Sequence, residues 1–213
     1  MKNRTQNTGR RRGFTLIEMM VAVTLFAVVM LVAVGALLAL TNANRKAQAL
    51  QSVMDNLNVA LDGMVRSIRM GSTYHCDDPA NPSTIYQTKD CPNGNKLIAF
   101  EPYGGDSSDP SDQWIYYFGP DINGINRIYK STNGQINSPP SYTQAYPVTS
   151  PDVKINDMEF YVVGTDPASK DPNNPDETQP KVVIIIKGTA GNAASEISTF
   201  HIQATAVQRH LDL

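Results

Sequence analysis

The feature that most constrains this chain is a long apolar run near its N-terminus. The 22 residues from Met19 to Leu40 carry no charge, and extending the run back to Phe14 adds only Glu18. A helix needs about 20 apolar residues to cross the roughly 30 Å hydrocarbon layer of a bilayer. The apolar core of a secretory signal is shorter, about 7–15 residues, and ends in a small-residue cleavage site. The run therefore predicts a membrane-spanning helix rather than an ordinary cleaved signal peptide.

A basic leader precedes the run and predicts its orientation. The first 13 residues contain no acidic side chain and five basic ones, which are Lys2, Arg4, Arg10, Arg11 and Arg12. Because basic residues beside a membrane span are retained in the cytoplasm, we expect a single pass through the cytoplasmic membrane. The N-terminus would lie inside, and everything after Leu40 would be exported.

Glu18 is the one charge within the apolar run. An acidic group at membrane depth costs about 2.5–3.5 kcal/mol at the helix centre and is usually paired or functional. Glu18 lies about one turn from the expected helix start, so it could also sit at headgroup level or stay protonated. Taken alone, the residue leaves both interpretations open.

Residues 13–18 read GFTLIE, and behind a basic leader this segment resembles the class III signal of type IV pilins and type II secretion pseudopilins. In that family a membrane prepilin peptidase cuts after the glycine and methylates the new terminal amine. The resemblance implies cleavage between Gly13 and Phe14 and an N-methylated Phe14. It also implies that Glu18 neutralises the terminal amine of a neighbouring subunit, which agrees with the need to pair charges in apolar surroundings.

The resemblance further implies a structural subunit rather than an enzyme. Its partners would be the prepilin peptidase, other pilin or pseudopilin subunits, the inner-membrane assembly platform, and membrane lipid before assembly. The final location would be an extracellular or periplasmic filament. Many major pilins carry a proline in the second half of the apolar run, whereas this chain has none before Pro79. This difference favours a minor pilin or a pseudopilin. A single long helix followed by a strand meander with two loop excursions resembles a minor pilin or a J-type pseudopilin more than a major subunit, but the sequence does not specify the machine.

An amphipathic pattern continues the helix beyond the membrane. Apolar residues recur at three- and four-residue steps, at Leu50, Val53, Met54, Leu57, Leu61, Met64, Val65 and Ile68. This spacing is typical of a helix with one buried face, and Gly71 is a typical stop signal. We predict one helix from Phe14 to about Met70. Residues 14–40 would span the membrane or form a filament core, and residues 41–70 would pack on the chain's own globular domain.

Residues 71–213 predict a β-rich globular domain. Runs of β-branched and aromatic residues are separated by Pro, Gly, Asn and Asp, which indicates strands and turns. The predicted strands are residues 96–101, 113–118, 126–131, 153–163, 181–187 and 197–208. The last alternates in polarity, so one face should be buried on the helix. With the helix, this predicts an α+β fold that resembles the pilin fold, in which a long N-terminal helix packs on an antiparallel sheet.

The two cysteines predict a disulfide. Cys76 and Cys91 both lie on the side expected to be exported, where oxidising conditions favour the bond. Closing a loop of about 15 residues would stabilise the domain by about 3 kcal/mol. His75 adjoins Cys76, but structural zinc sites show paired ligands at short spacing, so we do not predict zinc.

Two proline-containing segments, 135–151 and 164–180, are predicted as loops that could carry binding or be plain solvated excursions. Oxygen ligands for calcium are available in the second, at Asp166, Asp171, Asp176 and Glu177. Calcium prefers six to eight oxygens, and some pseudopilins bind it, but these residues lack a tight ligand spacing. We therefore predict no cofactor and favour an acidic loop.

The sequence has few features of an enzyme or of a nucleic-acid-binding protein. It contains no motif of a nucleophile elbow, a zinc protease or a phosphate loop. Loss of the leader would remove five of 18 basic residues and leave 13 against 20 acidic ones, a net charge of −7. Such a chain repels phosphate, so direct nucleic-acid binding is not predicted. The competing hypothesis is an exported binding or enzymatic domain held by an uncleaved signal anchor.

Overall fold

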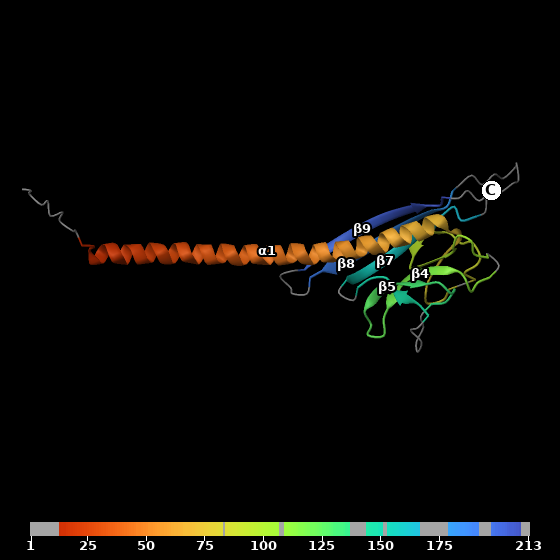
Figure 1. The fold of residues 1–213 in the computed structure, drawn as a ribbon, viewed down its shortest axis with the longest axis horizontal. Coiled ribbons are helices and arrows are strands. Elements are labelled where there is room, and N and C mark those ends of the chain that lie inside the picture. The colour runs from red at the N-terminus through yellow and green to blue at the C-terminus, as the bar shows by residue number, and fades with distance from the viewer. Residues whose placement is uncertain are drawn as a thin grey trace, which may run out of the picture. The chain divides into compact units, whose positions relative to one another are not determined.

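The computed structural model describes residues 13–82, 84–106, 109–136, 144–150, 153–166, 179–191 and 197–209. The chain divides into two compact units, Met1–Asn44 and Arg45–Leu213, and each is treated by itself. One helix, α1 (Leu16–Met70), contributes to both units (Figure 1). The predicted end of the helix is confirmed, and its start lies two residues later than predicted.

In the first unit α1 exposes its apolar side chains along its whole length. Within the described residues, it is the helix long and apolar enough to span a membrane by length and composition. Its two threonines turn their hydroxyls back onto the helix. Thr24 donates to the Met20 carbonyl oxygen at 3.1 Å, and Thr41 donates to that of Leu38 at 2.9 Å. Their polar groups are therefore satisfied internally, as an apolar environment requires.

In the second unit one face of α1 is buried, which confirms the amphipathic pattern. The buried residues are Val53, Leu57, Ala60, Leu61, Met64 and Ile68. Val59, on the opposite face, is 77% exposed. The helix ends just before Gly71, which lies close to strand β3 (Leu97–Glu101). A Cβ at Gly71 would lie 2.9 Å from the Glu101 carbonyl oxygen, so the position has no room for a side chain.

The strands form two antiparallel sheets. The first has the order β1-β3-β4-β5-β6, from β1 (Ser72–Asp77), β3 (Leu97–Glu101), β4 (Trp114–Pro120), β5 (Asn126–Ser131) and β6 (Tyr146–Pro147). The second has the order β2-β7-β8-β9, from β2 (Cys91–Asn95), β7 (Lys154–Val163), β8 (Lys181–Ala190) and β9 (Ser198–Val207). The first sheet contains the consecutive strands β3-β4-β5-β6 and the second contains β7-β8-β9, so each sheet includes an antiparallel meander.

All six predicted strands are present, as β3, β4, β5, β7, β8 and β9. The sequence did not predict β1, β2 or β6, or the division into two sheets. The sequence of β2 is CPNGN, and Gly94 has a φ of 84°. Such a composition favours a turn. The segment is a strand here because it pairs with β7.

The main core lies between the second half of α1 and the two sheets. Helix residues Leu57, Met64 and Ile68 belong to the same buried cluster as Phe100 of the first sheet and Phe160 of the second. A smaller cluster, formed by Leu97, Ala99, Ile115, Tyr117, Tyr129 and Ala145, covers the other face of the first sheet. Strand β3 is consequently buried on both faces. Figure 1 shows β7, β8 and β9 alongside this half of the helix.

The last strand follows the predicted alternation. On β9, Phe200 and Ala206 are buried and pack in the main core, whereas His201, Gln203 and Thr205 are exposed. The side chains on the Phe200 face of β9 therefore pack in the same buried cluster as the helix residues, as expected from the sequence.

Candidate functional site

The N-terminal segment that resembles a processing signal is described from Gly13 onward. Residues 13–15 precede the helix in a non-helical conformation, and the Phe14 side chain is 79% exposed. A Cβ at Gly13 would meet nothing within 4 Å, and its φ lies outside the left-handed region. The local structure therefore does not itself require glycine at this position.

Thr15 and Glu18 close the start of the helix with reciprocal hydrogen bonds. The Glu18 amide donates to the Thr15 hydroxyl oxygen at 3.3 Å, and the Thr15 amide donates to Glu18 Oε2 at 3.2 Å. The Thr15 hydroxyl also donates to Glu18 Oε2 at 3.2 Å. This is a capping box, in which the first free amides of a helix are satisfied by side chains at its end.

The capping box gives Glu18 a local role that the sequence interpretation missed. The signal was available, because Thr-x-x-Glu before an apolar run is the pattern of this motif. The carboxylate also lies in the first turn, where the helix dipole favours a negative charge. The hydrogen bonds use Oε2, so in the described part of the chain Oε1 is left for another donor.

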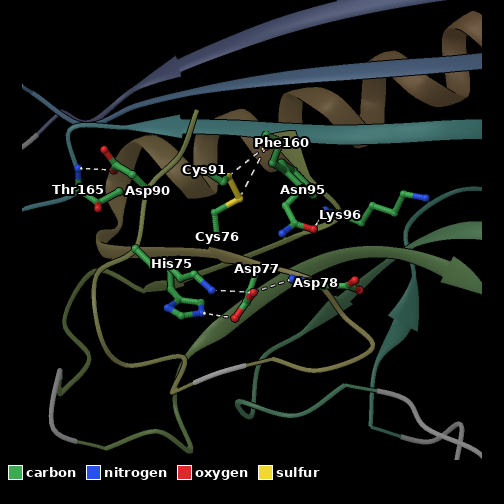
Figure 2. The surroundings of a disulfide bond; sticks show 11 residues. His75, Cys76, Asp77, Asp78, Asp90, Cys91, Asn95, Lys96, Phe160 and Thr165 are labelled. Carbon is green, nitrogen blue, oxygen red and sulfur yellow. Dashed lines mark hydrogen bonds and ion pairs between the residues drawn. A yellow bond between two sulfur atoms is a disulfide. The ribbon is translucent and has the colours of Figure 1, made fainter. Parts of the chain in front are cut away.

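The predicted disulfide is present between Cys76 and Cys91, whose Cα atoms are 5.7 Å apart. Cys76 lies on β1 and Cys91 on β2, so the bond joins the two sheets. Both sulfur atoms are buried near the carbonyl oxygen of Phe160 on β7, at 3.7 and 3.2 Å, as Figure 2 shows. Both cysteines belong to the main core, so the covalent link is part of it.

His75, next to the disulfide, has a partner at each ring nitrogen. Nδ1 lies 2.7 Å from the Gln87 carbonyl oxygen, and Nε2 lies 3.3 Å from Oδ2 of Asp77. Lys89 Nζ lies 2.8 Å from the other oxygen of Asp77. The side chain is buried in this polar network beside β1 (Figure 2), which accounts for a histidine here without a metal.

A second polar cluster, which the sequence interpretation missed, surrounds Glu101 at the end of β3. Glu101 is 3% exposed, and its Oε2 accepts a hydrogen bond from Gln113 Nε2 at 2.6 Å. Burial, followed by the charges of Asp112, Asp106 and Asp109 and a hydrogen bond with Asp112, raises the pKa of Glu101 to about 7. This carboxyl group therefore keeps its proton to a higher pH than an exposed glutamate does.

The remaining ligand predictions are only partly covered by the structure. Of the calcium candidates, Asp171, Asp176 and Glu177 lie outside the described residues, as does most of the loop 164–180. Residues 137–143 and 151 of the other predicted loop also lie outside them. Within the described ranges, no group of three or more His, Cys, Asp or Glu side chains is arranged to hold a metal ion.

The predicted site residues fall into two separate places. Gly13, Phe14 and Glu18 gather at the start of α1 in the first unit, and Cys76 and Cys91 lie in the core of the second. The leader residues 1–12 lie outside the described residues. The structure therefore describes the processing segment from the predicted cleavage position onward.

Comparison with protein families gives the segment an independent assignment. Residues 8–34 match the family described as the prokaryotic N-terminal methylation motif. No curated protein and no solved structure is significantly similar to the chain. With the apolar helix that follows, the motif indicates a membrane-anchored, exported protein. The chain thus carries the class III signal that marks the precursors of type IV pilins and pseudopilins.

Proposed function

We propose that the protein is a minor pilin or pseudopilin, a structural subunit of a type IV pilus or a type II secretion-like filament. The observation that carries the proposal is the methylation motif at residues 8–34, placed at the start of a helix whose first half is exposed and apolar. Prepilin peptidase would cut between Gly13 and Phe14 and methylate the new amine of Phe14. The absence of proline before Pro79 supports a minor pilin or a pseudopilin rather than a major subunit.

The surroundings of Gly13 support a role in recognition by the peptidase. Glycine is usually fixed in a fold by a left-handed backbone or by a close neighbour, and Gly13 has neither. A requirement for glycine here would therefore come from an enzyme that must accept the chain at this position. Phe14 is available to such an enzyme because its side chain is exposed.

The geometry of Glu18 supports its proposed role in assembly. Its capping bonds use Oε2, which leaves Oε1 for a cation from another molecule. The methylated amine of Phe14 in a neighbouring subunit is the cation that processing would create. Pairing of these two charges offsets the cost of taking either one out of water.

We expect the exposed apolar side chains of the first unit to be buried first in membrane lipid and later against other subunits. Large side chains such as Leu25, Phe26 and Leu31 are more than half exposed, and nothing in the described part of the first unit, from residue 13 onward, covers them. Membrane lipid would cover them before assembly, with the assembly platform nearby. Helices of other subunits would cover them in the filament, and the second unit, which has its own core, could fold before assembly.

Two substitutions in the native host test the proposal. Gly13→Ala should leave the leader attached, whereas Gly63→Ala, at another glycine without close neighbours, should be processed normally. Glu18→Gln keeps an acceptor for the cap but removes the charge, so the protein should be cleaved and yet be missing from sheared filaments. The control is Asp55→Asn, an exposed carboxylate on the same helix. A wild-type protein that keeps its leader, together with Gly13→Ala and Glu18→Gln variants that behave like it, would instead support an uncleaved signal anchor.

A further inference from the structure

A hollow in the second unit gathers most of the arginines that remain after the leader. Its volume is about 430 Å³, and its lining consists of Asp62, Val65, Arg66, Arg69, Met70 and Arg209. Residues 14–213 contain five arginines and eight lysines. Three of these arginines and no lysine line the hollow, so the preference is for the guanidinium group and not merely for positive charge.

Hydrogen-bonded backbone holds the three arginines in place. Arg66 and Arg69 are three residues apart near the end of α1 and share a face of the helix. Arg209 follows β9, and its amide donates to the Arg69 carbonyl oxygen at 2.8 Å. The amide of the preceding residue, Gln208, donates to the Pro180 carbonyl oxygen at 3.1 Å. Two segments distant in sequence thus contribute arginines to the lining of one hollow.

The charges of the lining are not balanced within the described residues. Asp62 is its one acidic residue and lies 3.2 Å from Arg66, with both side chains largely exposed, so this pair contributes little to stability. Neither Arg69 nor Arg209 forms an ion pair with a described residue. Three arginines against one aspartate leave the lining at +2, in a chain whose net charge would be −7 without its leader.

The helix dipole accounts for only part of this arrangement. A cation in the last turn of a helix is favoured by the partial negative charge there, which explains Arg69. The dipole does not explain why Arg209, which follows the edge strand β9 of the second sheet, lies at the same hollow. Val65 and Met70 are half-buried and add an apolar wall beside the three charged groups.

We propose that this hollow binds an oxyanion, the phosphate or carboxylate group of a ligand. The planar guanidinium group presents paired N–H donors that match two oxygens of such a group, which the point charge of lysine does not. The oxyanion belongs to a small free anion or to an acidic side chain of another polypeptide. The site lies entirely within the second unit and does not depend on filament formation.

Titration of the full-length protein in detergent, at constant ionic strength, tests the proposal. In one arm inorganic pyrophosphate is titrated into the protein by isothermal calorimetry. In the other arm a tetra-aspartate peptide is titrated in the same way. We expect saturable binding in at least one arm, and the tighter arm identifies the source of the anion. Absence of saturable binding in both arms would overturn the proposal.

Matched variants assign the binding to the hollow. Arg69→Gln and Arg209→Gln should each weaken it about tenfold, the usual consequence of losing a charged hydrogen bond. Arg209→Lys should also weaken it, because charge without the planar donor pair is not sufficient. Lys154→Gln removes the same charge from an exposed position outside the hollow and should have no effect beyond twofold. Equal weakening by Lys154→Gln would contradict a localised site.

Discussion

Replacement of Glu101 by glutamine should remove a pH dependence from the stability of the second unit. The Glu101 carboxyl group is buried, and its Oε1 has no hydrogen-bond partner among the described residues. Asp112, Asp106 and Asp109 surround it, and Gln113 donates to Oε2. Every charged group in this cluster is acidic. Ionisation of Glu101 is therefore opposed both by its burial and by repulsion from the neighbouring carboxylates.

The size and sign of the effect follow from the pKa of Glu101. Its value rises from 4.5 to about 7 on folding, and each unit corresponds to about 1.36 kcal/mol. The folded state therefore holds a proton that the unfolded chain releases between pH 4.5 and about 7. Its contribution is fully present below pH 4.5 and is lost as the pH rises through this window, which lowers the free energy of unfolding by about 3 kcal/mol.

Urea unfolding at several pH values measures this contribution. Trp114 is the one tryptophan, and its ring centroid lies 6.3 Å from that of Phe100, next to Glu101, so its fluorescence reports on this region. The wild-type protein should lose stability between pH 4 and pH 8, and Glu101→Gln should lose about 3 kcal/mol less. Asp55→Asn serves as the control on the exposed face of the helix. An unchanged slope in Glu101→Gln would refute the reasoning.

Three further changes test the packing of the second unit by urea unfolding. Reduction of the bond between Cys76 and Cys91, which closes a 15-residue separation, should cost about 3 kcal/mol; a loss below about 1 kcal/mol would show that the sheets do not need the link. Leu57→Ala removes a fully buried side chain and should cost about 2–5 kcal/mol, while Val59→Ala on the exposed face should stay within about 0.5 kcal/mol. Gly134→Ala should destabilise, because φ is 67° and the new Cβ would meet a backbone carbonyl oxygen; a neutral result would contradict that geometry.

Features encoded locally could be predicted from the sequence. The helix from Leu16 to Met70 follows from an apolar run and a regular spacing, both of which are visible within a few turns. The motif at residues 13–18 is local in the same way, and the family match covers it. The capping box of Thr15 and Glu18 is equally local, because its Thr-x-x-Glu pattern lies within one turn at the start of the helix.

Features that depend on distant residues could not be predicted. Strand β2 has a turn-like sequence and owes its conformation to β7, about 60 residues later in the chain. The arrangement in two sheets depends on which strands pair across long connections, and the cysteines did not reveal that their bond would join those sheets. The hollow of Arg66, Arg69 and Arg209 likewise exists only because β9 ends beside the end of α1.

Determination of the N-terminus of the mature protein tests the central claim most directly. The protein should be isolated from cells with an active prepilin peptidase, digested, and its N-terminal peptide identified by mass spectrometry. The proposal predicts a chain that begins at Phe14 with a methylated amine. A mature chain that still carries its leader, with Gly13 joined to Phe14, would contradict assignment of the protein to a filament.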